Sequence, residues 1–235
     1  MPRAGSLGRI PGNPAATPVR WTRMATAWLA GASGLVGGAL LRRLLQDDHF
    51  ERVVSFGRRS LPIQDPKLVQ VETDFSSDGV FDAAAAPAVA FSCLGTTIRK
   101  AGSQEAFRRV DHDAVLAFAQ AARRRGASTF IHVSSLGADP GSRAFYGRVK
   151  GETERDVQAL GFARVHALRP SILDGDRDER RPIERVGLVI GLALAPLLGK
   201  YRPTPVRAVA ATMVALARSP TTGSHVVEPD RMVDP

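Results

Sequence analysis

The sequence predicts a single α/β domain built on a doubly wound parallel sheet, and two patterns support this fold class. From residue 25 onward, short apolar runs alternate with longer amphipathic stretches, as repeated strand–helix units require. The short runs are apolar almost throughout, which is typical of strands covered by helices on both faces. The predicted strands are 25–30, 52–56, 68–72, 88–92, 129–134 and 164–169, with a last short strand near Val226.

The predicted helices fill the intervals between these strands. In the long middle helix, apolar residues recur at steps of three and four positions, so one face can pack on the sheet. Three arginines and Gly126 close that helix, where cations interact favourably with the helix dipole. The predicted helices are 35–46, 103–125, 143–160, 183–198 and 206–217.

The chain divides into a short extension and one domain. Residues 1–23 are rich in Gly, Pro and Ala and carry no acid, which predicts a disordered N-terminal extension, with a transit-like or basic arm as the alternative. Residues 24–235 are expected to form the domain, with residues 171–205 on its substrate side. The apolar run 186–199 is shorter than the roughly 20 residues of a membrane-spanning helix and contains Pro196, so no transmembrane segment is expected.

Composition restricts the partners. The net charge is +9, but arginine supplies nearly all of the basic residues and four arginines lie in the extension, so we expect no nucleic-acid partner. Cys93 is the single cysteine, which excludes an intramolecular disulfide, and the five histidines lack the spacing of metal ligands. With no signal-peptide core either, a cytoplasmic location is expected.

A glycine-rich turn is the sharpest local motif. It follows the first predicted strand and opens the first predicted helix, where glycines allow backbone N–H groups to approach a pyrophosphate. The order of strand, turn and helix favours a dinucleotide site of the Rossmann fold, and a purely structural turn is the alternative. The residues expected to bind cofactor here are Gly31, Ser33, Gly34, Leu35, Val36 and Gly37.

The ends of the next strands indicate which dinucleotide binds. Arg58 and Arg59 follow the second strand, where an arginine can pair with a 2′-phosphate, and this favours NADP (NADPH) over NAD. Two solvated loop arginines are the alternative. Asp74 and Phe75 could contact the adenine, although a simple turn carboxylate is an equal interpretation. After the fourth strand, small residues would let the cofactor lie against the backbone of Leu94, Gly95 and Thr96.

A catalytic arrangement follows the fifth strand. Tyr146 and Lys150 are four residues apart and share one helical face. An ammonium beside a phenol stabilises the phenolate, so such a tyrosine can act as acid or base. A serine hydroxyl at the strand end, from Ser134 or Ser135, could bond the substrate oxygen.

These motifs together resemble the short-chain dehydrogenase/reductase superfamily. More narrowly, the chain is similar to the atypical group that includes the Tat-interacting oxidoreductase-like protein and its bacterial relatives. The stretches that carry this resemblance are SFGRR at 55–59, CLGTT at 93–97, AFRRVDHDAVL at 106–116, HVSSLGADPGSRAFYGRVKGETE at 132–154, LRPSILDG at 168–175 and KYRPTPVRAVAATM at 200–213.

The resemblance implies roles for individual residues. Tyr146 and Lys150 would be catalytic, with Lys150 also contacting the nicotinamide ribose, and Ser135 would take the serine role with Ser134 as the alternative. Ser134, Tyr146, Arg169 and Pro170 are also expected to line the cofactor. Two departures stand out: residues 107–116 contain no asparagine to complete a proton relay, and Ser135 and Tyr146 are unusually close in sequence.

Three functions follow from this. The first is an NADPH-dependent oxidoreductase that transfers hydride between nicotinamide and a small-molecule carbonyl or alcohol. The second is a non-catalytic NADPH-binding regulator or assembly partner, and the third is sugar-nucleotide epimerisation, disfavoured because little chain follows the sixth strand. Fold analogy suggests a homodimer through the helices 103–125 and 143–160.

Overall fold

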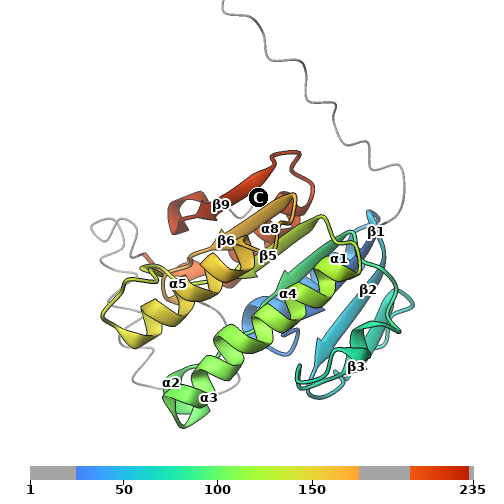
Figure 1. The fold of residues 1–235 in the computed structure, drawn as a ribbon. Helices are drawn as coiled ribbons and strands as arrows, with labels where there is room; N and C mark the ends of the chain where they lie inside the picture. The colour runs from blue at the N-terminus through green and yellow to red at the C-terminus, as the bar shows by residue number, and fades with distance from the viewer. Residues whose placement is uncertain (1–24, 175–201, 233–235) are drawn as a thin grey trace, which may run out of the picture.

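Seven parallel strands form the central sheet of the protein, whose computed structural model describes residues 25–174 and 202–232 (Figure 1). The strand order is β3-β2-β1-β4-β5-β6-β9, so the chain builds outward from β1 in both directions. The doubly wound α/β fold predicted from the sequence is therefore confirmed. The strands are β1 (Ala25–Ala30), β2 (Phe50–Gly57), β3 (Leu68–Glu72), β4 (Val89–Ser92), β5 (Thr129–Val133), β6 (Arg164–Leu168) and β9 (Gly223–Val227).

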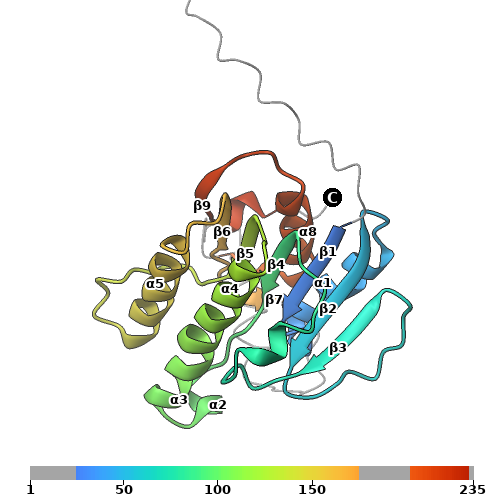
Figure 2. The ribbon, with the colours of Figure 1, turned by 45° about the vertical axis from the view of Figure 1, so that its right-hand side comes forward.

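Helices cover both faces of this sheet (Figures 1 and 2). One layer consists of α1 (Leu35–Gln46) and α8 (Val206–Ala217), which pack against each other. The other layer contains α5 (Phe145–Gln158) and the long middle helix. The short elements are η1 (Gly79–Phe81), α2 (Ile98–Ala101), η4 (Pro229–Arg231) and the pair β7 (Leu173–Asp174) and β8 (Thr204–Pro205).

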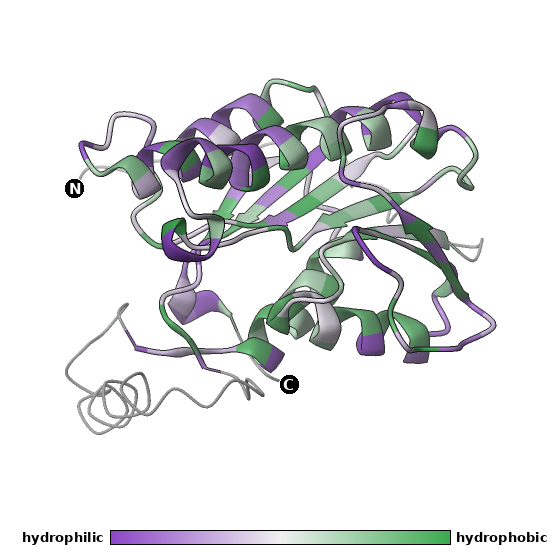
Figure 3. Cartoon of the chain, turned by 90° about the horizontal axis from the view of Figure 1, so that it is seen from below, coloured by the Kyte–Doolittle hydropathy of each residue, from purple (hydrophilic) through white to green (hydrophobic). Residues whose placement is uncertain are grey.

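Two apolar cores lie between these layers and the sheet. Figure 3 shows many apolar residues along the strands and on the helices of both layers. Alternate side chains of one strand enter different cores, because neighbouring residues in a strand point to opposite faces. Leu29 faces α1 and α8, whereas Trp28 lies in an aromatic cluster with Phe56, Phe81 and Phe118. The indole Nε1 of Trp28 donates a hydrogen bond to the carbonyl oxygen of Ala85 at 2.8 Å.

The middle helix differs from its prediction. It consists of α3 (Gln104–Arg108), a π-helical turn η2 (Arg109–Asp113) and α4 (Ala114–Arg124). The apolar spacing that predicted one regular helix continues across the turn, so periodicity could not reveal it. Most other predicted elements agree within two residues at each end. The predicted helix 183–198 and the extension 1–23 lie outside the described residues.

The topology brings the candidate motifs to one edge. The chain leaves the carboxyl ends of β1 and β4 toward opposite sides, and such a switch point is where open α/β sheets bind ligands. The glycine turn follows β1, the two arginines follow β2, and the Ser134 and Ser135 pair follows β5. In the described part of the chain, none of the helices has the length and apolar character needed to cross a membrane.

Candidate functional site

The glycine turn after β1 forms a tight backbone cradle. Gly31 has a φ of +84°, which favours glycine, and its carbonyl oxygen accepts a hydrogen bond from the Gly34 N–H at 3.1 Å. A Cβ at Gly31 would lie 2.7 Å from the Cys93 carbonyl, so the turn presses against the chain after β4. A Cβ at Gly37 would lie 2.1 Å from the Gly31 oxygen. Both positions therefore require glycine for the observed packing.

This cradle fits a dinucleotide pyrophosphate. Gly34 is the N-cap of α1 and has no side chain that could satisfy the first N–H groups of the helix. The first turn of α1 carries no acidic residue, so its positive dipole is not neutralised there. Ser33 and Gly34 are exposed, and Leu35 is half-buried. Val36 is buried in the core behind the turn, which leaves it a packing role in this structure.

Arg58 and Arg59 lie beside this cradle. They directly follow β2, the strand that pairs with β1, and both are exposed. Within the described residues, neither guanidinium takes part in an ion pair or side-chain hydrogen bond. Two cations at this place can accept an added phosphate without first breaking another contact.

Asp74 and Phe75 have different surroundings. Asp74 is exposed, and its carboxylate accepts hydrogen bonds from the Ser76 hydroxyl and amide, which lowers the pKa of Asp74. Phe75 has a φ of +68°, and its ring is buried against Phe81 and Phe118. The ring therefore belongs to the aromatic core, and adenine contact by these residues stays a prediction.

Tyr146 and Lys150 are on one face of α5, as predicted. Tyr146 is 39% exposed, and its ring lies 5.4 Å from that of Phe107. Lys150 is buried, and its Nζ lies 2.7 Å from Oδ1 of Asp111. Burial opposes the charge of this ammonium, but Asp111, Tyr146 and Glu154 outweigh that effect and raise the pKa of Lys150. The lysine is therefore held in its charged form beside an accessible phenol.

The loop after β4 covers this ion pair. The Thr96 N–H donates to Oδ2 of Asp111 at 2.8 Å. A Cβ at Gly95 would lie 3.4 Å from Oδ1 of Asp111 and 3.7 Å from Nζ of Lys150. Leu94 is partly buried against the aromatic core, whereas Gly95 is exposed. The structure thus brings the predicted cofactor loop and the predicted catalytic lysine together.

The two serines after β5 differ in their environment. Ser134 is buried, its N–H donates to the Leu168 carbonyl, and its hydroxyl has no hydrogen-bond partner among the described residues. Ser135 is half-buried, and its hydroxyl makes only a long 3.4 Å contact to the Leu136 carbonyl. Both hydroxyls therefore remain candidates for a substrate oxygen.

Arg169 and Pro170 lie at the end of β6. Arg169 forms a bidentate pair with Glu154, at 2.9 Å and 2.6 Å, and hydrogen bonding to Glu154 raises the pKa of the guanidinium. Its side chain is thus already engaged. The Pro170 carbonyl accepts from the Leu136 N–H at 3.0 Å, which ties the serine loop to β6.

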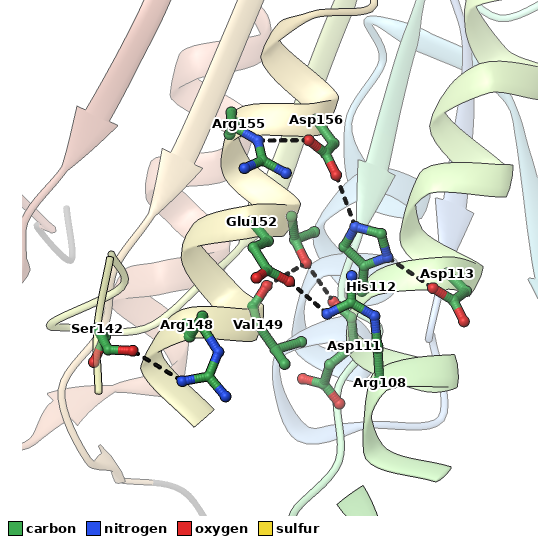
Figure 4. A network of polar contacts seen from close by, with 11 residues as sticks. Arg108, Asp111, His112, Asp113, Ser142, Arg148, Val149, Glu152, Arg155 and Asp156 are labelled. Atoms are coloured by element: carbon green, nitrogen blue, oxygen red, sulfur yellow. Dashed lines mark hydrogen bonds and ion pairs between the residues drawn. The ribbon is translucent and has the colours of Figure 1, made fainter. Parts of the chain in front are cut away.

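The π-helical turn η2 contributes residues that sequence reasoning passed over. Asp111 and His112 are both buried, although consecutive residues of a helix point in different directions. Figure 4 shows His112 between Asp113 and Asp156, with ring nitrogens at 2.7 Å and 2.9 Å from their carboxylates. The same close-up shows Arg108 paired with Glu152 of α5. The sequence offered one signal for these residues, the acidic Asp111-His112-Asp113 within the predicted helix 103–125. A carboxylate on a helix face that packs against the protein interior needs a buried partner.

No cluster of three or more potential metal ligands occurs in residues 25–174 and 202–232. Asp111 instead forms an ion pair with Lys150, and the carboxylate of Asp113 contacts the His112 ring at 2.7 Å.

Fold and site together define a nucleotide-binding protein of the Rossmann type, and comparison with known proteins identifies its family. Residues 31–220 match the family model described as NAD(P)H-binding. The chain is 38% identical to Protein fmp52, mitochondrial, of Emericella nidulans over 178 residues, covering 73% of this chain and 76% of that protein. It is 40% identical to Protein HTATIP2 of Rattus norvegicus over 163 residues, covering 68% and 67%. The chain therefore belongs to the NAD(P)H-binding family, in the atypical short-chain dehydrogenase/reductase group that its motifs resemble.

Solved structures agree on the fold. MoeE5 in complex with UDP-glucose and NAD has a TM-score of 0.66 at 21% identity, covering 88% of this chain and 79% of that one. A short-chain dehydrogenase from Burkholderia cenocepacia in complex with NADP has a TM-score of 0.65 at 17% identity, covering 88% and 90%. At these identities the likeness concerns the fold alone.

One expectation from the sequence is wrong. A cytoplasmic location was expected, but several similar proteins, among them Fmp52 of Saccharomyces cerevisiae and of Coccidioides immitis, are named mitochondrial. The expectation used the lack of a signal-peptide core and the single cysteine. Neither feature separates the cytoplasm from the inside of another reducing compartment.

Proposed function

We propose that the protein is an NADPH-dependent oxidoreductase that transfers hydride between nicotinamide and a small-molecule carbonyl or alcohol. The observation that carries this proposal is the buried Lys150 ammonium, held charged one helical turn from the accessible Tyr146. Exchanging both members of a buried ion pair for apolar residues is often neutral or stabilising, so stability alone gives little reason for a lysine at this position. A charged lysine is, however, suited to stabilising a phenolate nearby.

In the reducing direction, Tyr146 donates its phenolic proton to the carbonyl oxygen while the carbonyl carbon accepts the hydride. Bound NADPH would supply that hydride from the edge where β1, β4 and β5 end. The Lys150 ammonium stabilises the phenolate left behind, and Ser135 or Ser134 orients the oxygen by a hydrogen bond. The products are the alcohol, the oxidised cofactor and a Tyr146 phenolate, which regains a proton from solvent.

The preference for NADPH over NADH would depend on the two arginines that follow β2. Arg58 and Arg59 are exposed and unengaged within the described residues, which supports 2′-phosphate recognition and thus NADPH. Gly31, Gly34 and Gly37 would hold the pyrophosphate, and the backbone of Gly95 and Thr96 would lie along the nicotinamide half. The substrate class is a carbonyl or alcohol compound.

The test is a reductase assay against a panel of aldehydes and ketones. Replacing Tyr146 by Phe removes only the hydroxyl, so we expect turnover to fall by about 100-fold or more, the range of a general acid, while NADPH binding persists. Ser134→Ala and Ser135→Ala, compared side by side, identify which hydroxyl orients the substrate. Wild-type turnover that survives Tyr146→Phe would overturn the mechanism, and NADPH binding without turnover on any substrate would favour a regulator.

A further inference from the structure

The carboxylate of Asp111 joins three separate parts of the candidate site. Its side chain is fully buried in η2, at 0% exposure. Oδ1 lies 2.7 Å from the Lys150 ammonium on α5, and Oδ2 accepts the Thr96 N–H from the loop after β4. The backbone carbonyl of Asp111 also accepts from the Thr153 hydroxyl at 3.0 Å. One residue thus connects the middle helix, α5 and the predicted cofactor loop.

The π-helical geometry of η2 allows this connection. A π-turn contains one more residue than a regular helical turn, and such turns are frequent at functional sites. Here the turn lets two consecutive residues reach α5, since Asp111 pairs with Lys150 and His112 pairs with Asp156. In a regular helix these side chains would be about 100° apart. The π-turn therefore allows Asp111 to reach Lys150 while the next residue, His112, also contacts α5.

Burial makes each charge depend on the other. An isolated ammonium or carboxylate loses several kcal/mol of hydration in the interior, and the loss is compensated only by a close, well-hydrogen-bonded partner. Lys150 and Asp111 are 6% and 0% exposed in their side chains. The loop at Gly95 covers them so closely that a Cβ there would touch both groups. A carboxylate beside this lysine therefore stabilises its charged form against the effect of burial.

We propose that Asp111 is a positioning residue of the oxidoreductase site, which fixes the Lys150 ammonium in its charged form and anchors the Thr96 loop above it. The inference rests on the proposed function. Asp111 does not touch substrate; it acts through Lys150 and through the loop.

Four groups face the Lys150 ammonium from the elements around it. They are Asp111 of η2, Tyr146 and Glu154 of α5, and His132 of β5. Burial lowers the pKa of Lys150, and Asp111 is the first of the groups that raise it again. Burial also lowers the pKa of His132 to about 4, so this imidazole is neutral near pH 7 and adds no charge. Loss of the Asp111 charge should therefore lower the pKa of Lys150.

The substitution Asp111→Asn tests this inference. An amide has nearly the same shape and its oxygen can still accept the Thr96 N–H, but the negative charge is gone. Asp113→Asn is the matched control, because Asp113 lies in the same π-turn and its carboxylate contacts His112 instead of Lys150. The direct measurement is the pH titration of lysine ¹⁵Nζ signals by NMR in lysine-labelled protein. The chain has only four lysines, and Lys150→Arg assigns the relevant signal.

In Asp111→Asn we expect the titration midpoint of Lys150 to fall by at least about 1 pH unit, within the range known for buried lysines. The alkaline limb of the kcat profile should move in the same direction, and the Kd for NADPH should change by less than about threefold, well below the effect of a lost charged hydrogen bond. Asp113→Asn should change neither.

An unchanged Lys150 midpoint in Asp111→Asn, or an equal shift in Asp113→Asn, would overturn the inference. If Asp111→Asn does not fold, the wild-type protein still decides: a Lys150 midpoint below the roughly 10.4 of an exposed lysine would overturn the inference, because the carboxylate then fails to offset the effect of burial. If the wild type reduces no carbonyl, the proposed function fails. The lysine titration still tests whether the Asp111 carboxylate stabilises the charged form of Lys150.

Discussion

Replacing Gly37 by alanine should disturb the glycine turn, whereas the same change at the next residue should not. A Cβ at Gly37 would lie 2.1 Å from the Gly31 oxygen, 2.7 Å from the Gly31 carbonyl carbon and 2.9 Å from the Ala32 Cα. All three neighbours are backbone atoms, so no side-chain rotation can relieve the clash. At Gly38 the nearest atom is the Ala32 oxygen at 3.4 Å, which is close to ordinary contact.

The magnitude follows from these distances. Since carbon and oxygen atoms normally approach to about 3.5 Å and this Cβ would lie at 2.1 Å, α1 must move away from the turn by about 1.4 Å in Gly37→Ala. Such overpacking costs about 1–3 kcal/mol, partly offset by the roughly 1 kcal/mol that alanine gains over glycine inside a helix. Gly38→Ala should keep that gain, so the two variants should differ by about 2 kcal/mol, or several degrees in Tm.

Cofactor binding should separate the two variants further. If backbone N–H groups of the turn hold the pyrophosphate, a shift of this size weakens at least one charged hydrogen bond, and the Kd for NADPH should rise by about tenfold or more. Urea denaturation and calorimetric titration of both variants measure these effects. Equal stability and equal NADPH affinity in Gly37→Ala and Gly38→Ala would refute the assignment of the turn.

Two further predictions concern buried charge. Lys150→Met leaves the Asp111 carboxylate buried without its partner, so the free energy of unfolding should fall by about 3–5 kcal/mol. Adding Asp111→Asn removes the unpaired charge and should restore part of this loss. A double variant no more stable than Lys150→Met alone would contradict the prediction. Burial lowers the pKa of His132 and of His166 to about 4, below the 6.5 of an exposed histidine, so their neutral forms stabilise the fold fully above pH 6.5 and less as the pH falls toward 4. Between pH 6.5 and 4, each histidine should lower the free energy of unfolding by up to about 1.4 kcal/mol per pH unit, as measured by urea denaturation. His166→Gln should make this pH dependence less steep. An unchanged slope in His166→Gln would show that His166 is already protonated in the folded protein.

Most of the fold could be predicted from local pattern. The strands are buried apolar runs, and this signal is strong when helices cover both faces of a sheet. The glycine turn was predictable because Gly31 has a positive φ and Gly37 packs directly on the backbone of Gly31 and Ala32, and both requirements are local. Tyr146 and Lys150 were predictable because their spacing alone places them on one helical face.

The remaining features depend on contacts between distant segments. Asp111 and Lys150 are 39 positions apart, and their pairing depends on a π-turn that leaves the apolar spacing unchanged. Phe75 looked available to flank a base, but the structure packs its ring in the aromatic core. Arg169 looked free to contact cofactor, yet Glu154 engages its guanidinium. Such partners come from tertiary packing, which one sequence without its structure does not reveal.

The most direct test of the central claim is calorimetric titration of the protein with NADPH and NADH. Arg58→Ala/Arg59→Ala is the matched variant, since both side chains are exposed and their removal leaves the core intact. The proposed function predicts that the wild type prefers NADPH, and that the double variant loses about 1.5–3 kcal/mol of NADPH affinity per charged contact while NADH binding is unchanged. Equal affinity of the wild type for both cofactors, or no binding of either one, would contradict it.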